Sequence, residues 1–149
     1  MQKINLPEFA PLLKNIGQRK YIFDSFRKKF VTLTPEEWVR QHWAYFLVTY
    51  IGVPKGVIGI EVSLKYNTMN KRADIVVFDK SQQPALIVEC KASHVALTEQ
   101  TCLQIANYNA VFKSKFLIIS NGMEHFLFEV DFQSNTIFRL QELPVYSEW

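Results

Sequence analysis

The sequence lacks an apolar stretch long enough to cross a membrane. Its longest such stretch, 44–53, is interrupted by Thr49 and Gly52, and a spanning helix needs roughly 18–20 apolar residues. Glu8 and Pro11 likewise interrupt the region where a secretory signal peptide would carry its apolar core. We therefore expect a cytoplasmic protein without a membrane partner.

Cysteine and net charge are also low. The two cysteines, Cys90 and Cys102, match no zinc or redox spacing, so we expect free thiols in a reducing compartment. The formal net charge of +3 is only mildly basic. Such a charge permits a polyanionic partner but does not by itself argue for one.

What is present fits one folded domain. The 149 residues are 48% hydrophobic and 21% charged, which is enough to bury a core, and we expect a single domain over 1–149. The segment 1–32 mixes aromatic and basic side chains. It could face nucleic acid as an arm, but more often such a segment packs its aromatic side chains on the domain, and we favour that interpretation.

The first clear helix begins after a well-specified cap. Thr34 suits the N-cap, Pro35 the first helical position, and Glu37 the carboxylate position of a capping box. Leu33 and Trp38 occupy the two positions of a hydrophobic staple. The helical apolar pattern continues to about residue 50.

From there the apolar period changes to alternation. Strands are predicted for V-I-G-I-E-V-S-L, A-D-I-V-V-F, A-L-I-V-E-C-K, F-L-I-I-S, F-L-F-E-V and T-I-F-R-L. A polar link over 65–72 separates the first two, and a helix from Thr98 to about Lys113 precedes the fourth. Asn121-Gly122 predicts a hairpin turn. The order indicates an α/β (α+β) fold with a mixed central β-sheet flanked by helices.

Charged residues end the apolar strand P-A-L-I-V-E-C-K. Glu89 and Lys91 share one face of the strand, about 7 Å apart, and Asp74 lies fifteen positions before Glu89 on the preceding predicted strand. If these strands are hairpin neighbours, two carboxylates and an amine share one small volume. A bare Glu-x-Lys usually forms a salt bridge, but this context favours a site.

Such a group of side chains suits a hard cation. Mg²⁺ prefers oxygen ligands and keeps several waters, so Asp74, Glu89 and the backbone carbonyl of Cys90 would supply a half-shell. A bound metal lowers the pKa of its water and neutralises charge on a phosphate under attack. Lys91 could orient the water and stabilise the developing negative charge.

The ordered motifs resemble the PD-(D/E)XK metal-dependent nucleases. The pattern requires an acidic residue on one strand and (D/E)-x-K on the next, here Asp74 and Glu89-Cys90-Lys91. The chain most resembles the N-terminal nuclease domain of the restriction subunit of type I restriction enzymes, over roughly 20–130. The matching blocks are L-T-P-E-E-W-V-R-Q, K-R-A-D-I-V-V-F, I-V-E-C-K-A, Q-I-A-N-Y-N and I-S-N-G.

The resemblance implies a restriction-endonuclease-like core and assigns roles to individual residues. Asp74 and Glu89 would bind Mg²⁺, for which Mn²⁺ can substitute, and Lys91 would be the catalytic lysine. Three further assignments follow: Gln104 and Tyr108 match a Gln-x-x-x-Tyr motif that helps position DNA, Lys71 and Arg72 would contact the substrate, and Glu37 matches an early glutamate that can approach the metal.

Several of these residues have ordinary structural alternatives. Glu37 fits its capping box, and Gln104 and Tyr108 could be helix-surface residues. Glu61 either lines the cleft or is solvated, and His94 either touches phosphate or is incidental.

The main departure from the family is the missing motor. The chain has no G-x-x-x-x-G-K phosphate-binding loop, so we expect a stand-alone DNA endonuclease that acts with a second copy or with other restriction-system subunits. The alternative is a non-catalytic nucleic-acid-binding or accessory module of a restriction or defence system, and a weaker one is a structural partner in a defence complex.

Overall fold

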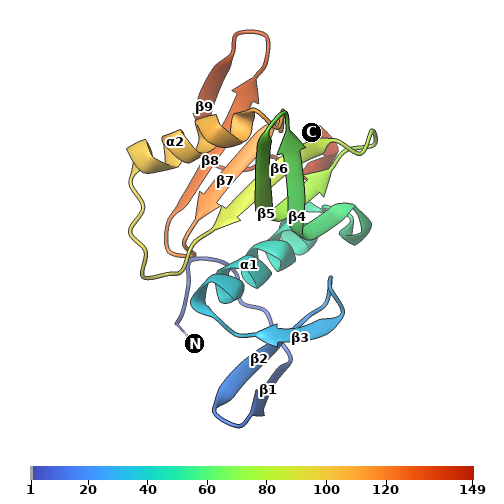
Figure 1. Ribbon diagram of the computed structural model, residues 1–149, viewed down its shortest axis with the longest axis vertical. Coiled ribbons are helices and arrows are strands. Elements are labelled where there is room, and N and C mark those ends of the chain that lie inside the picture. Colours follow the sequence, from blue (N-terminus) through green and yellow to red (C-terminus); the bar gives the residue numbers. More distant parts are fainter. Residues whose placement is uncertain (1) are drawn as a thin grey trace.

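The computed structural model describes residues 2–149, which form two β-sheets and two α-helices (Figure 1). The small sheet contains β1 (Leu13–Ile16), β2 (Arg19–Asp24) and β3 (Lys29–Thr32). The large sheet contains β4 (Ile58–Tyr66), β5 (Met69–Phe78), β6 (Pro84–Cys90), β7 (Phe116–Ser120), β8 (His125–Asp131) and β9 (Thr136–Leu140). The helices are α1 (Pro35–Phe46) and α2 (Glu99–Ala110), with a π-helical turn η1 (Leu47–Ile51) and short 3-10 turns η2 (Lys55–Val57) and η3 (Tyr146–Glu148).

The six strands of the large sheet lie in chain order. Every neighbouring pair is antiparallel except β6 and β7, which are parallel. A parallel pair needs a crossover, and α2 lies in that connection. The mixed sheet with flanking helices confirms the predicted α+β class and fits a restriction-endonuclease-like fold.

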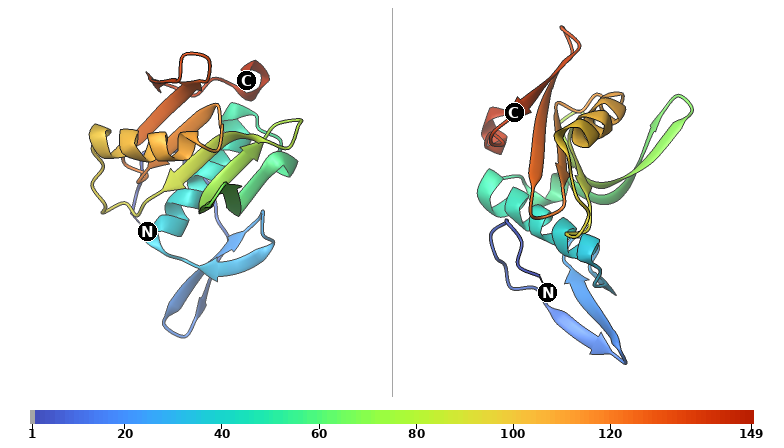
Figure 2. Two further views of the ribbon diagram at one scale, coloured as in Figure 1. Left: turned by 45° about the horizontal axis from the view of Figure 1, so that its top comes forward. Right: turned by 90° about the vertical axis from the view of Figure 1, so that its left-hand side faces the viewer.

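The two α-helices cover opposite faces of the large sheet (Figure 2). On one face, Trp43 of α1 belongs to the same buried cluster as Ile75 and Val77. On the other face, Ala106 of α2 belongs to a cluster with Val76. Because side chains alternate along a strand, three consecutive apolar residues of β5 supply both cores. Burying each such side chain contributes roughly 1.5–3 kcal/mol.

Helix α1 begins as the sequence predicts and ends differently. The Thr34 hydroxyl accepts the N–H of Glu37 at 3.0 Å, which confirms the N-cap. After Phe46 the helix widens into η1, and Gly52 closes it with φ of 80° and an N–H directed to the Leu47 carbonyl. A left-handed residue at this point is inexpensive only for glycine.

Three local expectations needed correction. The presumed polar link over 65–72 belongs almost entirely to β4 and β5, which turn at Asn67. This hairpin is polar because it projects from the sheet, so its side chains meet water. Helix α2 ends at Ala110, before the expected Lys113. The segment 13–32 forms a separate antiparallel sheet. The sequence did not predict this sheet, because its short strands show no clear alternation of apolar and polar residues.

The predicted hairpin turn at Asn121 is present between β7 and β8. The Asn121 side-chain oxygen accepts the N–H groups of Met123 and Glu124 at 2.9 and 2.8 Å, and Gly122 has φ of 84°. The turn also binds the N-terminal segment, because Asn5 N–H donates to the Gly122 carbonyl.

Candidate active site at the end of strand β6

The end of β6 lies beside the middle of β5 and places Glu89 opposite Asp74. In the antiparallel pairing of β5 with β6, Ile75 lies opposite Val88, so Asp74 and Glu89 hold the next pair of positions. Asp74 Oδ2 accepts the backbone N–H of Cys90 at 2.8 Å. Two carboxylates therefore meet where β6 leaves the sheet.

Glu89 is held from two sides by ammonium groups. Its Oε2 lies 2.6 Å from Lys71 Nζ and its Oε1 lies 3.1 Å from Lys91 Nζ, and only 13% of its side chain is exposed. Burial alone would raise the pKa of Glu89, but the hydrogen bonds and positive charges of the two lysines outweigh it and hold the pKa below its ordinary value. Glu89 is thus ionised and fully paired.

Lys91 carries a firmly bound proton. Burial acts to lower its pKa, yet the hydrogen bond to Glu89 and the negative charges of Glu89, Asp74 and Glu36 raise the pKa above its ordinary value. At neutral pH Lys91 is therefore a cation and hydrogen-bond donor rather than a free amine.

On the face of the large sheet that α1 covers, Arg40 holds Asp74. Its Nη2 lies 2.8 Å from Asp74 Oδ1, and only 7% of the arginine side chain is exposed. Burial acts to lower the pKa of Arg40, but the charges of Asp74 and Glu37 raise it. The two carboxylates of the candidate site are thus anchored by different kinds of cation, Asp74 by an arginine of α1 and Glu89 by a lysine of β5 and a lysine that follows β6.

The Arg40 side chain belongs to a larger ionic network. Arg40 also pairs with Glu37, whose carboxylate accepts from Arg27 Nη2 at 2.6 Å and from Gln41 at 2.9 Å. Arg27 in turn pairs with Asp24 and, at 2.7 Å, with Glu61. This chain of contacts joins the turn between β2 and β3 to β4 and β5 of the large sheet, and Figure 1 shows α1 between the two sheets.

Glu37 therefore has a role that neither sequence interpretation anticipated. Its backbone N–H completes the Thr34 cap, while its buried carboxylate is occupied by two arginines. A second carboxylate of α1, that of Glu36, interacts electrostatically with Asp74 and Lys91. Its side chain is 46% exposed and lies 3.3 Å from Arg40. Burial and repulsion by Asp74 raise the pKa of Glu36. Its only signal in the sequence was its place beside Glu37 in P-E-E.

Helix α2 adds residues on the Glu89 side. The Tyr108 ring centroid is 5.6 Å from Lys71 Nζ, so Tyr108 lies beside the site with its ring partly exposed. Gln104, one turn earlier, is exposed to solvent. Asn109, which the sequence did not single out, is buried and donates from Nδ2 to Glu89 Oε2 at 3.3 Å. Its signal was its place on the buried face of the helix with Cys102 and Ala106.

Of the remaining candidates, Arg72 and Glu61 pair with each other. Arg72 Nη2 lies 2.9 Å from Glu61 Oε2, and the arginine side chain is 67% exposed. Glu61 is thus part of the ionic network rather than simply solvated. His94 lies exposed in the loop before α2.

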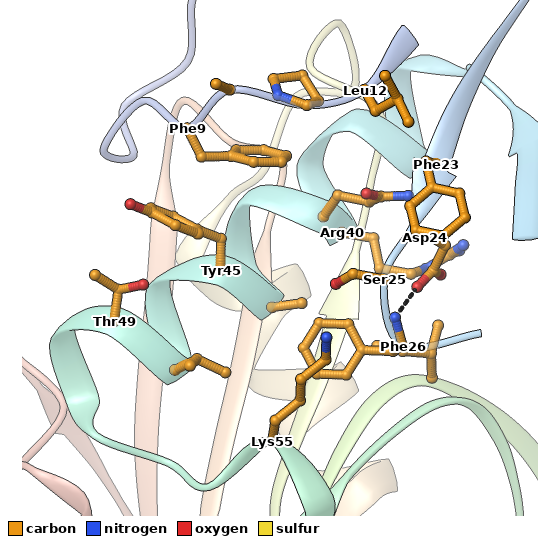
Figure 3. A pocket seen from close by; sticks show the side chains of 16 residues that line it. Phe9, Leu12, Phe23, Asp24, Ser25, Phe26, Arg40, Tyr45, Thr49 and Lys55 are labelled. Atoms are coloured by element: carbon orange, nitrogen blue, oxygen red, sulfur yellow. Dashed lines mark hydrogen bonds between the residues drawn. The ribbon is translucent and has the colours of Figure 1, made fainter. Parts of the chain in front are cut away.

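A largely apolar cavity lies elsewhere in the molecule. Figure 3 shows a pocket of about 400 Å³ between the N-terminal segment and α1, lined by aromatic side chains such as Phe9, Phe26 and Tyr45. Arg40 lines this pocket as well as contacting Asp74. Neither Asp74 nor Glu89 lines it, so the candidate chemistry sits at an open strand end and not in the pocket.

Within residues 2–149, several further features bear on function. Both cysteines are buried free thiols, as expected, and burial raises the pKa of Cys102 to about 11. No helix of this part of the chain is long and apolar enough to cross a membrane. There is also no group of three or more His, Cys, Asp or Glu side chains that could hold a metal.

That ligand inventory discriminates between metals. Zinc sites are built from three or four His, Cys or carboxylate ligands, which the described residues around Asp74 and Glu89 do not offer. Two carboxylates fit a hard cation that retains several waters. The carboxylate oxygens are already paired with Lys71, Lys91 and Arg40, so a metal would have to compete with these cations.

Comparison with known proteins gives one family. A family model described as the type I restriction enzyme R protein N terminus matches residues 35–144. No curated protein matches the chain.

Proposed function

Because the chain belongs to the family of type I restriction enzyme R protein N termini, we propose that it is a metal-dependent nuclease domain that hydrolyses phosphodiester bonds in DNA. The observation that carries the proposal is the placement of Asp74 and Glu89 at paired positions of neighbouring strands, with Lys91 Nζ 3.1 Å from Glu89. This is the arrangement that the motif Asp, then Glu-x-Lys, requires.

In this proposal, Asp74 and Glu89 hold Mg²⁺ or Mn²⁺ together with the Cys90 carbonyl. The metal would supply a water of lowered pKa and would neutralise phosphate charge. The chemistry of the donors supports a hard cation, since all three ligand atoms are oxygens. Burial and the charge of Asp74 raise the pKa of Glu36 on the first turn of α1, and its partly exposed carboxylate would be available to a water of the metal shell.

Lys91 has a defined electrostatic role. Because its pKa is raised, it remains protonated through the neutral range and donates hydrogen bonds to the attacked phosphate, where negative charge develops. A protonated lysine is a poor general base, so the water would lose its proton to solvent or to a carboxylate.

The basic side chains near the site give DNA an approach. Lys71, Arg72 and Lys65 line a shallow depression of about 350 Å³ on the β4–β5 hairpin, and Tyr108 lies against Lys71. Lysines and arginines bind the phosphate backbone without reading the DNA sequence. From α2, Gln104 and Tyr108 would position the DNA strand.

The decisive experiment is nicking of supercoiled plasmid by the purified chain in Mg²⁺ or Mn²⁺. The Lys91→Ala variant should lose at least about 100-fold in rate, the scale of one charge-stabilising group. Lys80→Ala, which removes a lysine from the β5–β6 turn, is the matched control and should cut like the wild type. Equal nicking by Lys91→Ala, or none by the wild type, would overturn the proposal.

A second function is favoured by one observation. Both carboxylates are already neutralised by cations of the protein itself, as in a binding module that needs no metal. Such an accessory module of a restriction system would bind DNA in a salt-dependent manner, and binding would survive Asp74→Asn and Glu89→Gln. Cleavage of both strands with one site per chain would, in contrast, call for a second copy or another restriction-system subunit.

A further inference from the structure

Two of the polar atoms left without partners in the core belong to side chains that hold the candidate carboxylates. Among residues 2–149, the buried side-chain atoms without a hydrogen bond are Arg40 Nε, Trp43 Nε1 and Asn109 Oδ1. Arg40 binds Asp74 and Asn109 binds Glu89. A buried polar atom without a partner is costly, and such atoms are rare enough that each calls for an explanation.

Asn109 is the more informative of the two, because its free atom is an acceptor. The side chain is 1% exposed, and its Nδ2 donates to Glu89 Oε2 at 3.3 Å. Exchanging the amide nitrogen and oxygen would place a carbonyl oxygen against a carboxylate, which is repulsive, so the pairing with Glu89 fixes the orientation. Oδ1 is thus an unused acceptor in the same carboxamide group that binds Glu89, a candidate metal ligand.

The missing partner must be a donor that comes close to Glu89. A hard cation bound by two carboxylates keeps several waters, and each of these waters donates hydrogen bonds. Groups that hold a metal ligand on one side and a metal-bound water on the other tune affinity without touching the metal. No donor of the described chain reaches Oδ1.

We propose that Asn109 is a positioning residue of the metal site, with its amide N–H orienting Glu89 and its Oδ1 accepting a hydrogen bond from a metal-bound water. The inference rests on the proposed function, since it needs a metal at Glu89. It assigns to α2 a role in metal affinity that is separate from the DNA-positioning role proposed for the exposed Gln104 and Tyr108.

Asn107 provides a matched control on the same helix. It is exposed, and its Nδ2 donates to the Leu103 carbonyl at 2.9 Å. The test is calorimetric titration of Mn²⁺ into the metal-free chain, with thermal unfolding of the same samples to show that each variant is folded. Asn109→Ala should raise the Mn²⁺ dissociation constant by about 10–100-fold, and Asn107→Ala should leave it unchanged.

A second variant isolates the oxygen from the amide N–H. Asn109→Asp keeps the acceptor and the size but sets an oxygen against Glu89, a repulsion that bound Mn²⁺ relieves, so its Mn²⁺ affinity should stay at or above that of the wild type, after correction with Asn107→Asp for the added charge. If Asn109→Asp weakens Mn²⁺ as much as Asn109→Ala, the acceptor role is wrong. If Asn109→Ala binds Mn²⁺ like the wild type, Asn109 has no role at the metal, although the proposed function stands. If the wild type binds no Mn²⁺, the proposed function fails and this inference fails with it.

Discussion

The two carboxylates of the candidate site are held in contrasting ways. Asp74 is bound by Arg40, a planar, always charged group that is itself locked between Glu36 and Glu37. Glu89 is bound by Lys71 and Lys91, which are flexible point charges on rotatable stems. The Asp74 side is therefore prearranged by the fold, whereas the Glu89 side can exchange its cations. Arg40 therefore fixes the geometry of the site, whereas Lys71 and Lys91 can be displaced by a ligand.

The largest expected effect comes from breaking the prearranged side. Arg40→Ala leaves the buried carboxylate of Glu37 with one fewer cation and leaves Asp74 without its cation, and breaking a buried pair costs about 3–5 kcal/mol. Urea unfolding should show this loss in the free energy of unfolding. Arg72→Ala, which removes an exposed arginine, should cost less than about 1 kcal/mol. A similar cost for both variants would mean that burial of the network has no energetic consequence.

A smaller effect is expected on the Glu89 side, and it depends on pH. The pKa of Glu89 is lower in the folded chain than its ordinary value of 4.5, so its contribution is present above pH 4.5 and is lost as pH falls through the lowered pKa. Glu89→Gln should cost about 1–2 kcal/mol at pH 7. The difference from the wild type, followed by denaturant unfolding across the acid range, should shrink below pH 4.5. A difference that is constant with pH would show that the charge of Glu89 does not contribute.

The smallest effect probes the exchange of cations directly. Lys71→Gln removes an ammonium that would compete with a metal for Glu89, so we expect the Mn²⁺ dissociation constant to fall about fivefold, equivalent to about 1 kcal/mol. Lys65→Gln removes a nearby lysine of the same hairpin that does not contact Glu89, and it serves as the control. Weaker Mn²⁺ binding by Lys71→Gln would indicate that Lys71 supports the metal site rather than competing with it.

Local sequence signals predicted the parts of the fold that depend on local physics. The Thr34 cap, the alternation along β4 and the apolar run of β7 each depend on neighbours within a few residues. The placement of Asp74 beside Glu89 followed from one assumption, that their strands pair, because the register then decides the rest.

The rest depended on contacts between distant residues. The carboxylate of Glu37 in α1 binds Arg27, which lies in the turn between β2 and β3, and no periodicity reports such a pair. Asn109 was missed because its spacing marks only a buried helix face, and burial of an amide shows a role only when its partners are known. The small sheet was missed because β1 is exposed along its length, so it has no apolar alternation.

The ionic network also determines where the folding unit begins. The family match starts at residue 35, yet Arg27, in the turn between β2 and β3, supplies a cation to both Glu37 and Glu61. A chain shortened to 35–149 would keep every strand of the large sheet and both α-helices. It would also keep two acidic side chains whose shared counter-ion had been removed. We therefore expect the limits of independent folding to extend beyond the limits of sequence similarity, with the small sheet in the same cooperative unit as the large one.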